Sequence, residues 1–346
     1  MGEIKLLDAT LRDGGFGIED AVKTGLKPKI YTEEIINSII YYLSRSNLEI
    51  IELGAIEITE NNSEKYCIYQ SIEEISKKIP LESSQNQMYV ALFRGPDIPI
   101  ENIPNWNEKY CKGVRVIIRY SELQKSLDFC KALSEKGYKV FVQPMLTLRY
   151  TEEELDLIIK ASNEMKAYAL YFVDSYGYMT KKDVIYFLKK YDEKLDLEIK
   201  IGFHSHNNLN LAFSNVKAFI NYKTNRDIIV DSCVLGMGQG AGNLQTEIIS
   251  DYLNKYHNKK YDYNMILEIC ELIEKFSPKP LWGYTITTLL PAIHKVAYKY
   301  SINLRERYGL SYTEINYLLE NISEDLRHRY TQENLDKLLN LMKKGE

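Results

Sequence analysis

The segment Thr10-Leu11-Arg12-Asp13-Gly14-Gly15 places a guanidinium beside a carboxylate on a glycine-rich stretch. A carboxylate oxygen can ligate a divalent cation, and a guanidinium can form two parallel hydrogen bonds with a carboxylate or an enolate. The pattern therefore indicates a metal site that also binds an anion, with Asp13 as ligand and Arg12 as the partner of the anion. As a fragment on its own, it is more often a turn with two solvated charges.

His204-Ser205-His206 contains two of the five histidines of the chain. Side chains at positions i and i+2 of a strand point to the same face, so both imidazoles can reach one ion. With Asp13 they make a set of two histidines and one carboxylate, which leaves positions open for substrate and water on Mn²⁺, Mg²⁺, Co²⁺, Fe²⁺ or Zn²⁺. Two ordinary histidines are the alternative.

The run from Gly236 to Asn243 matches the G-x-G-x-x-[GA] pattern of dinucleotide-binding loops through Gly236, Gly238 and Ala241. A nucleotide-binding unit needs a further strand with an acidic residue about 20 positions on, and the next segment supplies no strand-like run. We interpret the run as a loop that holds an anion or brings the backbone close to the metal, with the Asn243 amide oxygen as a further ligand.

Eight short apolar or β-branched runs predict strands, and all but the third are followed by a segment with helical periodicity. The predicted strands are Ile4–Asp8, Glu49–Gly54, Met88–Phe93, Val114–Arg119, Lys139–Gln143, Ala169–Asp174, Glu198–His204 and Ile228–Leu235. The predicted helices are Thr32–Arg45, Ser63–Lys78, Ser121–Lys136, Thr151–Lys166, Thr180–Tyr191, Asn208–Tyr222 and Leu244–Tyr256. Strands that are apolar on both faces belong to parallel sheets covered by helices, so eight β/α units favour a closed (β/α)₈ TIM barrel of the α/β class. An open doubly wound sheet is the alternative.

From about Tyr261 onward the strand-like runs stop. Helical periods alternate with proline and glycine breaks at Pro278, Pro280, Gly283, Pro291 and Gly309. We predict a TIM-barrel catalytic domain over residues 1–260 and a helical C-terminal extension over residues 261–346. The chemical residues follow the first, seventh and eighth predicted strands, whose carboxyl ends meet at one rim of a barrel.

The charge balance argues against nucleic acid as a partner, because 44 Lys+Arg against 48 Asp+Glu give a formal net charge of −4. The start of the chain lacks the features of a signal peptide, and no apolar run is long enough to cross a membrane. The five cysteines are widely spaced without a C-x-x-C pair, which favours a reducing compartment. We therefore expect a cytoplasmic protein without a membrane partner.

Three linked motifs carry a family resemblance: residues 6–15, residues 202–208 and residues 236–243. Their order and spacing resemble those of the DRE-TIM metallolyases, which include 4-hydroxy-2-oxovalerate aldolase, hydroxymethylglutaryl-CoA lyase and the isopropylmalate synthases. The resemblance covers roughly residues 3–260. Length, helical tail and Val173-Asp174-Ser175 are most similar to the 4-hydroxy-2-oxovalerate aldolase branch. It implies a metal-dependent aldolase that cleaves or forms a 4-hydroxy-2-oxo acid through a pyruvate enolate.

Carried over by position, the resemblance implies that Asp13, His204 and His206 ligate the metal, commonly manganese, and that Arg12 stabilises the enolate. Cleavage of a carbon–carbon bond next to a carbonyl leaves a carbanion, which a cation and a guanidinium can stabilise electrostatically. Ser175 is similar in position to a hydroxyl near the substrate carboxylate. Glu52, at the end of the second predicted strand, could orient Arg12 or move a proton.

One position departs from the family pattern. The oxovalerate aldolases have a histidine three residues beyond the metal aspartate, which takes the proton of the substrate hydroxyl, and this chain has Phe16 there. The family also contributes a tyrosine from its tail, and Tyr284 is the residue we expect to replace the base. A tyrosine is a poor base unless its pKa is lowered, so a different substrate or a bound water as base are the alternatives.

Arg94, Arg119 and Arg149 lie at or just after the ends of the third, fourth and fifth predicted strands. Together with Arg12 they predict a mouth that receives a strongly anionic substrate, phosphorylated or dicarboxylic. Arginines solvated in loops are the alternative.

Two other functions stay open from the sequence. One is a Claisen-type synthase that condenses an acyl-CoA with a 2-oxo acid, and the other is a barrel that has lost catalysis and acts as a binding protein. The resemblance also implies an aldehyde dehydrogenase partner on the C-terminal helices. We further expect a homo-oligomer, with some of the 28 tyrosines at the contact.

Overall fold

A computed structural model describes residues 2–58, 64–81, 86–277, 279 and 281–340. In this part of the chain the strands form one sheet in the order β1-β9-β8-β7-β6-β5-β4-β2-β3, and β1 also pairs with β2. The strands are β1 (Ile4–Asp8), β2 (Ile50–Ile56), β3 (Ile68–Tyr69), β4 (Met88–Phe93), β5 (Gly113–Ile118), β6 (Lys139–Pro144), β7 (Ala169–Asp174), β8 (Lys200–Ser205) and β9 (Ile228–Ser232). The pairing of β1 with both β2 and β9 closes an eight-stranded barrel, with β3 as an addition on β2.

Every strand pairing in the barrel is parallel, for example Leu6 with Val230 between β1 and β9 and Leu7 with Ile50 between β1 and β2. The strands are almost entirely buried, as expected where helices cover the outside and side chains fill the inside. The predicted TIM barrel is confirmed, and the open doubly wound sheet is excluded.

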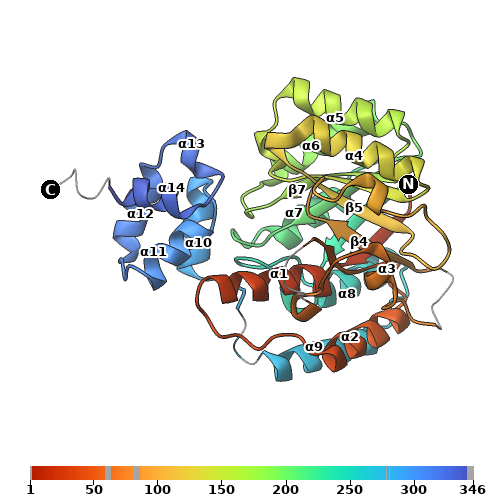
Figure 1. Cartoon of the computed structure of the whole chain (residues 1–346), viewed down its shortest axis with the longest axis horizontal. Coiled ribbons are helices and arrows are strands. Elements are labelled where there is room, and N and C mark those ends of the chain that lie inside the picture. Colours follow the sequence, from red (N-terminus) through yellow and green to blue (C-terminus); the bar gives the residue numbers. More distant parts are fainter. Residues whose placement is uncertain (1, 59–63, 82–85, 278, 280, 341–346) are drawn as a thin grey trace.

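The helices that cover the barrel are α2 (Glu33–Arg45), α3 (Ile72–Ser76), α4 (Leu123–Glu135), α5 (Glu152–Glu164), α6 (Lys181–Lys194), α7 (Ala212–Ile220), α8 (Thr246–Tyr256) and α9 (Tyr263–Phe276). Six of them lie close to their predicted ranges, whereas α3 is shorter than predicted and no range was predicted for α9. Figure 1 shows α4, α5 and α6 together on one side of the strands, and α2 beside α9 on another. Thr151 and Glu154 form a reciprocal capping box at the start of α5.

Helix α1 (Thr10–Lys23) contains the motif that reads as a glycine-rich loop in the sequence. Glycine disfavours helix formation, yet this helix packs so closely on other backbone segments that a side chain does not fit. A Cβ on Gly15 would lie 1.9 Å from the carbonyl oxygen of Tyr66, for example. Arg12 and Asp13 are therefore held in the first turns of a helix and buried.

The predicted helix over Ser63–Lys78 is wrong in its first part. Residues 68–69 form β3, which pairs with β2, and only Ile72–Ser76 is α-helical. Residue 63 lies outside the described residues. Tertiary pairing with the edge of β2 overrides the local helical pattern here.

The chain after the barrel forms a second hydrophobic core. Helices α10 (Ile286–His294), α11 (Lys299–Glu306), α12 (Tyr312–Glu320), α13 (Glu324–Arg327) and α14 (Gln332–Leu339) make the C-terminal lobe, residues 286–339, whose core includes Leu290, Tyr300 and Leu318. Figure 1 shows this lobe in blue beside the barrel. Pro291 lies inside α10 and does not end it, whereas Pro278 and Pro280 lie outside the described residues.

The residues of α9 pack into the barrel core, through Ile266, Ile269 and Ile273. We infer that the boundary between the barrel domain and the C-terminal lobe lies after Phe276, about 15 residues beyond the boundary expected from the sequence. No helix in the described residues is long and apolar enough to span a membrane.

Candidate metal centre and active-site cavity

Asp13, His204 and His206 meet at the carboxyl end of the barrel. Each offers one ligand atom, and the three atoms lie within 4.8 Å of one another. Oδ2 of Asp13 is 3.6 Å from Nε2 of His204 and 4.0 Å from Nε2 of His206. Two ligands at ~2.1 Å from one ion stand between roughly 3 and 4.2 Å apart, so the two separations from Asp13 lie within the range for ligands of one divalent cation.

Two different elements position the histidines. His204 lies on β8, whereas His206 follows the strand and is held by an isolated bridge to Asn243. The backbone amide of His206 donates to the carbonyl of Asp174 at 3.4 Å. This backbone pairing carries the second imidazole beyond the end of the strand to the same place as the first.

The protonation states also suit a cation. Burial alone would raise the pKa of Asp13, but Arg12 and the two imidazoles together hold it below its usual value. Burial lowers the pKa of His206 to about 4. At neutral pH the group therefore offers a carboxylate and a neutral imidazole with a free lone pair, which is what metal ligation requires.

Asn243 lies next to Asp13 but presents its nitrogen. Its Nδ2 donates to Oδ2 of Asp13 and, at 2.8 Å, to the carbonyl of Met237. Its Oδ1 is buried and has no hydrogen-bond partner within the described residues. Rotation of the amide would turn that oxygen toward the ion, so ligation by Asn243 requires a flip relative to this structure.

Gly238 lets the loop after β9 approach this group. Its φ is +157°, and a Cβ there would lie 2.2 Å from Nδ2 of Asn243 and 3.1 Å from Oδ2 of Asp13. The glycine run thus brings the backbone close to Asp13 and Asn243, while the predicted role of this loop beside a metal stays a prediction.

A chain of buried charges continues from His204 to Arg12, and we call it the floor network. Nδ1 of His204 lies 2.9 Å from Oδ2 of Asp231, and the same carboxylate pairs with Arg115. Arg115 Nη1 donates to Oε2 of Glu52 at 2.7 Å, and Arg12 Nε donates to the same oxygen at 2.8 Å. The network orients His204 so that its Nε2 faces Asp13, and it fixes the plane of the Arg12 guanidinium.

Glu52 serves this network rather than the cavity. Its side chain is completely buried, and it is not among the residues that line the cavity above the metal centre. Of the two roles expected from the sequence, orientation of Arg12 fits the geometry, and movement of a substrate proton does not.

Sequence reasoning missed Arg115 and Asp231. Each is a single charge inside an otherwise apolar strand, in Gly113–Ile118 and in Ile228–Ser232. Such a charge on a buried strand requires a partner of opposite sign inside the barrel, and that is the signal that could have found them.

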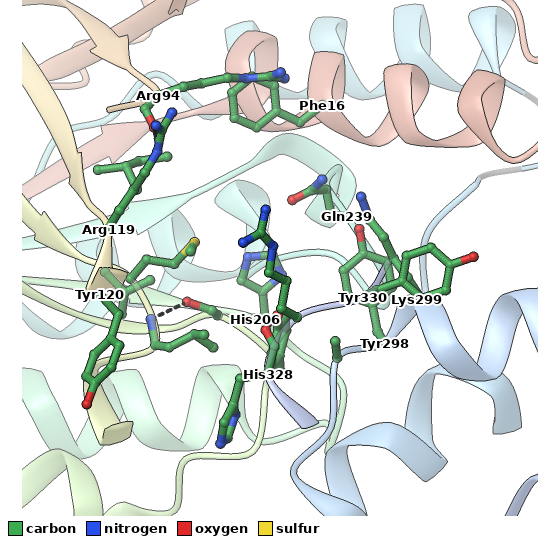
Figure 2. Close-up of a pocket in the computed structure, with 18 of the residues that line it drawn as sticks. Phe16, Arg94, Arg119, Tyr120, His206, Gln239, Tyr298, Lys299, His328 and Tyr330 are labelled. Atoms are coloured by element: carbon green, nitrogen blue, oxygen red, sulfur yellow. Dashed lines mark hydrogen bonds between the residues drawn. The ribbon is translucent and has the colours of Figure 1, made fainter. Parts of the chain in front are cut away.

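A cavity of about 970 Å³ opens above the metal centre. The ends of the barrel strands and helix α1 form one wall, and residues of the C-terminal lobe form another. In Figure 2, Phe16, Arg94 and Arg119 lie on one side of His206, and Tyr298, Lys299 and Tyr330 lie on another. The site is therefore shared between the barrel and the lobe.

Phe16 and the tail tyrosine differ in their placement. Phe16 is buried in the cavity wall, with the Arg94 guanidinium carbon 3.9 Å from its ring centroid. Tyr284 is 54% exposed and does not line the cavity, so the expectation that it replaces the base is wrong. Tyr298 and Tyr330 are the tyrosines after the barrel that line the cavity, and the hydroxyl of Tyr298 donates to Asp20.

The three arginines expected at the mouth all line the cavity, but two of them have partners there. Arg94 pairs with Glu19 at 2.5 Å and with Glu57 at 2.8 Å. Arg119 pairs with Asp97 and Glu122. Carboxylates of this chain thus neutralise both, and each is a weaker candidate for substrate binding than the sequence suggests.

Arg149 differs from these two. Its guanidinium carbon lies 4.4 Å from the ring centroid of Tyr120, and no carboxylate of the described residues lies within ion-pair distance. Ser175 also lines the cavity, where its Oγ accepts a hydrogen bond from the amide of Leu146 at 2.8 Å.

Comparison with known proteins finds a matching family model and similar sequences. Residues 112–273 match the model of the family described as HMGL-like. The match covers a little under half of the chain. The chain is 27% identical over 256 residues to a 4-hydroxy-2-oxovalerate aldolase of Geobacillus genomosp. 3, covering 73% of this chain and 71% of that protein. A 4-hydroxy-2-oxovalerate aldolase of Chloroflexus aurantiacus is 24% identical, covering 87% and 88%.

Solved structures share the fold of this chain. Hydroxymethylglutaryl-CoA lyase from Pseudomonas aeruginosa superposes with a TM-score of 0.60 at 16% identity, over 80% of this chain and 94% of that one. The carboxyl transferase domain of Rhizobium etli pyruvate carboxylase, solved with pyruvate, gives 0.68 at 15% identity, over 100% and 61%. These two structures show the fold alone, whereas the family model and the relatives named 4-hydroxy-2-oxovalerate aldolase confirm the resemblance to the DRE-TIM metallolyases and the prediction of a lyase.

Proposed function

We propose that the chain is a divalent-metal-dependent aldolase that cleaves or forms a 4-hydroxy-2-oxo acid, with pyruvate as one of the two smaller molecules. The observation that carries the proposal is the buried group of Asp13, His204 and His206 beside Arg12 at the floor of a large cavity. The names of the two relatives support the same reaction.

Asp13, His204 and His206 would hold the ion, with Asn243 as a fourth ligand after rotation of its amide. Manganese is our first candidate because the family resemblance implies it. Two imidazoles with one carboxylate also suit Mg²⁺, Co²⁺, Fe²⁺ or Zn²⁺, so these ions are the alternatives. A bound divalent cation supplies Lewis-acid stabilisation to the negative charge that develops on the 2-oxo group.

Arg12 is positioned to share that charge. Its Nε donates to Glu52 and its Nη1 pairs with Asp13, whereas Nη2 makes no hydrogen bond to the described residues. Because the floor network fixes the guanidinium plane, Nη2 can donate to an enolate oxygen without reorganisation. A preorganised donor of this kind is more effective in a buried site than in water.

Gln143 and Ser175 are proposed to bind the carboxylate of the 2-oxo acid. Gln143 follows Val142 near the end of β6, lines the cavity, and has a buried Nε2 without a partner in the described part of the chain. The Ser175 hydroxyl accepts from Leu146 and keeps its own proton for donation. An unpaired buried donor is costly, so a ligand oxygen would satisfy Gln143.

In the cleavage direction, the 4-hydroxyl loses its proton and the C3–C4 bond breaks. Its electrons form the enolate of pyruvate, C4 becomes the aldehyde carbon, and C3 then takes up a proton. Phe16 cannot accept a proton, so the base is not the residue at this position, where the family pattern has a histidine. Burial raises the pKa of Tyr298 well above its usual value, which makes Tyr298 a hydrogen-bond donor at neutral pH rather than a base.

The test is metal content together with pyruvate release from a panel of 4-hydroxy-2-oxo acids. We expect about one divalent ion per chain and metal-dependent release of pyruvate. His204→Ala should lose activity by at least about 10³-fold, because the variant lacks a ligand of the group that stabilises the enolate. His257→Ala, at the opposite end of α8 from the cavity, is the matched control and should keep both metal and activity.

Two outcomes would replace the proposal. Bound metal without pyruvate release, but with thiol release from an acyl-CoA in the presence of a 2-oxo acid, would favour the Claisen-type synthase. Bound ligand without any turnover would favour a barrel that acts as a binding protein.

The acidic 2-oxo substrate is the partner that the relatives support, and two further partners stay predictions. The C-terminal lobe exposes Ile293, Tyr312 and Tyr317, which is compatible with a contact to an aldehyde dehydrogenase or to a second copy of the chain. Co-purification with a dehydrogenase, and light scattering of the isolated chain, test these two predictions.

A further inference from the structure

The cavity is large for a short 2-oxo acid. Its volume of about 970 Å³ is at the upper end of the ~300–1,000 Å³ of pockets that bind drug-sized ligands. The candidate metal ligands, Arg12 and Gln143 are proposed to bind the 2-oxo acid end of the substrate. The part of the cavity toward the C-terminal lobe is therefore available for the other end of the substrate.

Two arginines face this outer space from different lobes, and we call them the outer arginine pair. Arg149 ends the short helical turn Thr147–Arg149 after β6, and Arg329 follows α13 in the C-terminal lobe. The hydroxyl of Tyr176 donates to the carbonyl of His328 at 2.9 Å, which fixes the segment before Arg329 to the barrel rim. In Figure 2, Tyr330 lies on the same side of the cavity as Tyr298 and Lys299, and His328 lies below His206 in the view.

The outer arginine pair is free to bind a ligand. Of the other cations that line the cavity beyond Arg12, Lys23, Arg94, Arg119 and Lys299 each pair with a carboxylate of this chain. Neither Arg149 nor Arg329 has a carboxylate within 4.0 Å among the described residues, although Asp325 lines the same outer space. An arginine without a carboxylate partner in a concave site is suited to bidentate recognition of a carboxylate or a phosphate.

We propose that the outer arginine pair binds a terminal anionic group of the substrate, so that the aldehyde used or released by this enzyme carries a carboxylate or a phosphate. The inference rests on the proposed aldolase function and narrows its substrate class. The reaction stays a simple aldol addition, in which C3 of pyruvate loses a proton, bonds to the aldehyde carbon, and the aldehyde oxygen gains a proton. The anionic group takes no part in bond making and acts through binding.

The experiment measures condensation of pyruvate with matched charged and neutral aldehydes. Succinic semialdehyde is compared with pentanal, and glyceraldehyde 3-phosphate with glyceraldehyde, by the KM and kcat of each acceptor. We expect one charged acceptor to exceed its neutral match in kcat/KM by at least about 10-fold, mainly through KM, since binding energy away from the reacting carbon acts in this way. Which charged acceptor is preferred distinguishes a carboxylate from a phosphate.

Arg149→Gln and Arg329→Gln should each raise the KM of the charged acceptor by about 10-fold or more, and leave the neutral acceptor within about 2-fold. Arg307→Gln is the matched control, because Arg307 lies in the same lobe, pairs with Gln332 and does not line the cavity. Equal kinetics for charged and neutral acceptors, or variants that change both alike, would overturn the proposal.

Calorimetry with inorganic phosphate and with succinate separates this proposal from the proposed function. Binding by the wild type that is lost in both arginine variants supports the outer subsite even if no aldehyde is condensed. Condensation of neutral aldehydes, with no binding of either anion, would overturn the subsite and leave the aldolase in place.

Discussion

The floor and the outer opening of the cavity both carry arginines, but the two regions use them differently. In the floor network, Arg12 and Arg115 are buried and bound to Glu52, Asp13 and Asp231. At the opening, Arg119 is partly exposed and Arg149 has no carboxylate partner in the described residues. The floor therefore holds a fixed geometry for chemistry, whereas the opening keeps cations available for a ligand.

Burial is the physical reason for the difference. Charged side chains that are buried away from water must be paired, and the attraction between them is strong because the dielectric constant of the protein interior is low. An ion pair near solvent contributes little to the free energy of unfolding. An arginine there can therefore exchange a protein carboxylate, or water, for a ligand at a small cost in free energy.

The largest expected effect tests the floor directly. Arg115→Met leaves Glu52 and Asp231 buried without their shared cation, and should lower the free energy of unfolding by about 3–5 kcal/mol. Arg119→Met, at the opening, should lower it by less than about 1 kcal/mol. Urea unfolding of both variants measures the difference, and equal losses would contradict the comparison.

A pH series tests a further buried carboxyl group, that of Asp8, at the end of β1 just before helix α1. Asp8 is completely buried and accepts hydrogen bonds from Thr10 and Thr246, and burial raises its pKa to about 6. Between its ordinary pKa and about 6, the folded chain binds more protons than the unfolded chain, so this group contributes a loss of stability as the pH rises. Asp8→Asn should therefore gain roughly 2–3 kcal/mol relative to the wild type between pH 4 and pH 7.

Urea unfolding at several pH values checks this prediction. The relevant quantity is the change with pH of the difference between the two proteins, because a constant offset reflects only the lost hydrogen bond. A difference that stays flat across the range would show that Asp8 titrates normally in the folded chain.

A smaller effect is expected on metal affinity. Asp231→Asn removes the charge behind His204 Nδ1, and should weaken manganese binding by about 10–100-fold, as is typical for the partner of a metal-ligating histidine. Asp97→Asn removes the carboxylate beside Arg119 at the opening and serves as the control. Calorimetric titration with Mn²⁺ should give unchanged affinity for the control, and a loss in both would contradict the comparison.

The smallest effect concerns the contact between barrel and lobe. Tyr176→Phe removes the hydrogen bond to the carbonyl of His328 and should cost about 1 kcal/mol. The expected readout is faster hydrogen exchange in α13 with unchanged exchange in the barrel strands. Unchanged exchange in both would show that this bond does not hold the lobe on the cavity.

The fold and the group of candidate metal ligands could be predicted from the sequence, whereas the ion-pair partners of the arginines could not. Asp13, His204 and His206 follow strands whose ends must meet in a parallel barrel, so local patterns suffice to bring them together. The ion pairs of Arg115 join residues 63 and 116 positions apart, and no local pattern encodes which strand faces which across the barrel. The ion pair of Arg94 is a similar case. Its partner Glu19 lies 75 positions away on α1, a helix that the sequence did not predict because its start is rich in glycine.

The sequence by itself determined the closed barrel and the residue types of the metal group, because strand burial and side-chain alternation are local properties. Only the tertiary structure decided that Tyr298 and not Tyr284 reaches the cavity, and that Arg94 and Arg119 are neutralised while Arg149 is not. Those outcomes depend on how the C-terminal lobe and helix α1 pack on the rim, which is a contact between segments far apart in the chain.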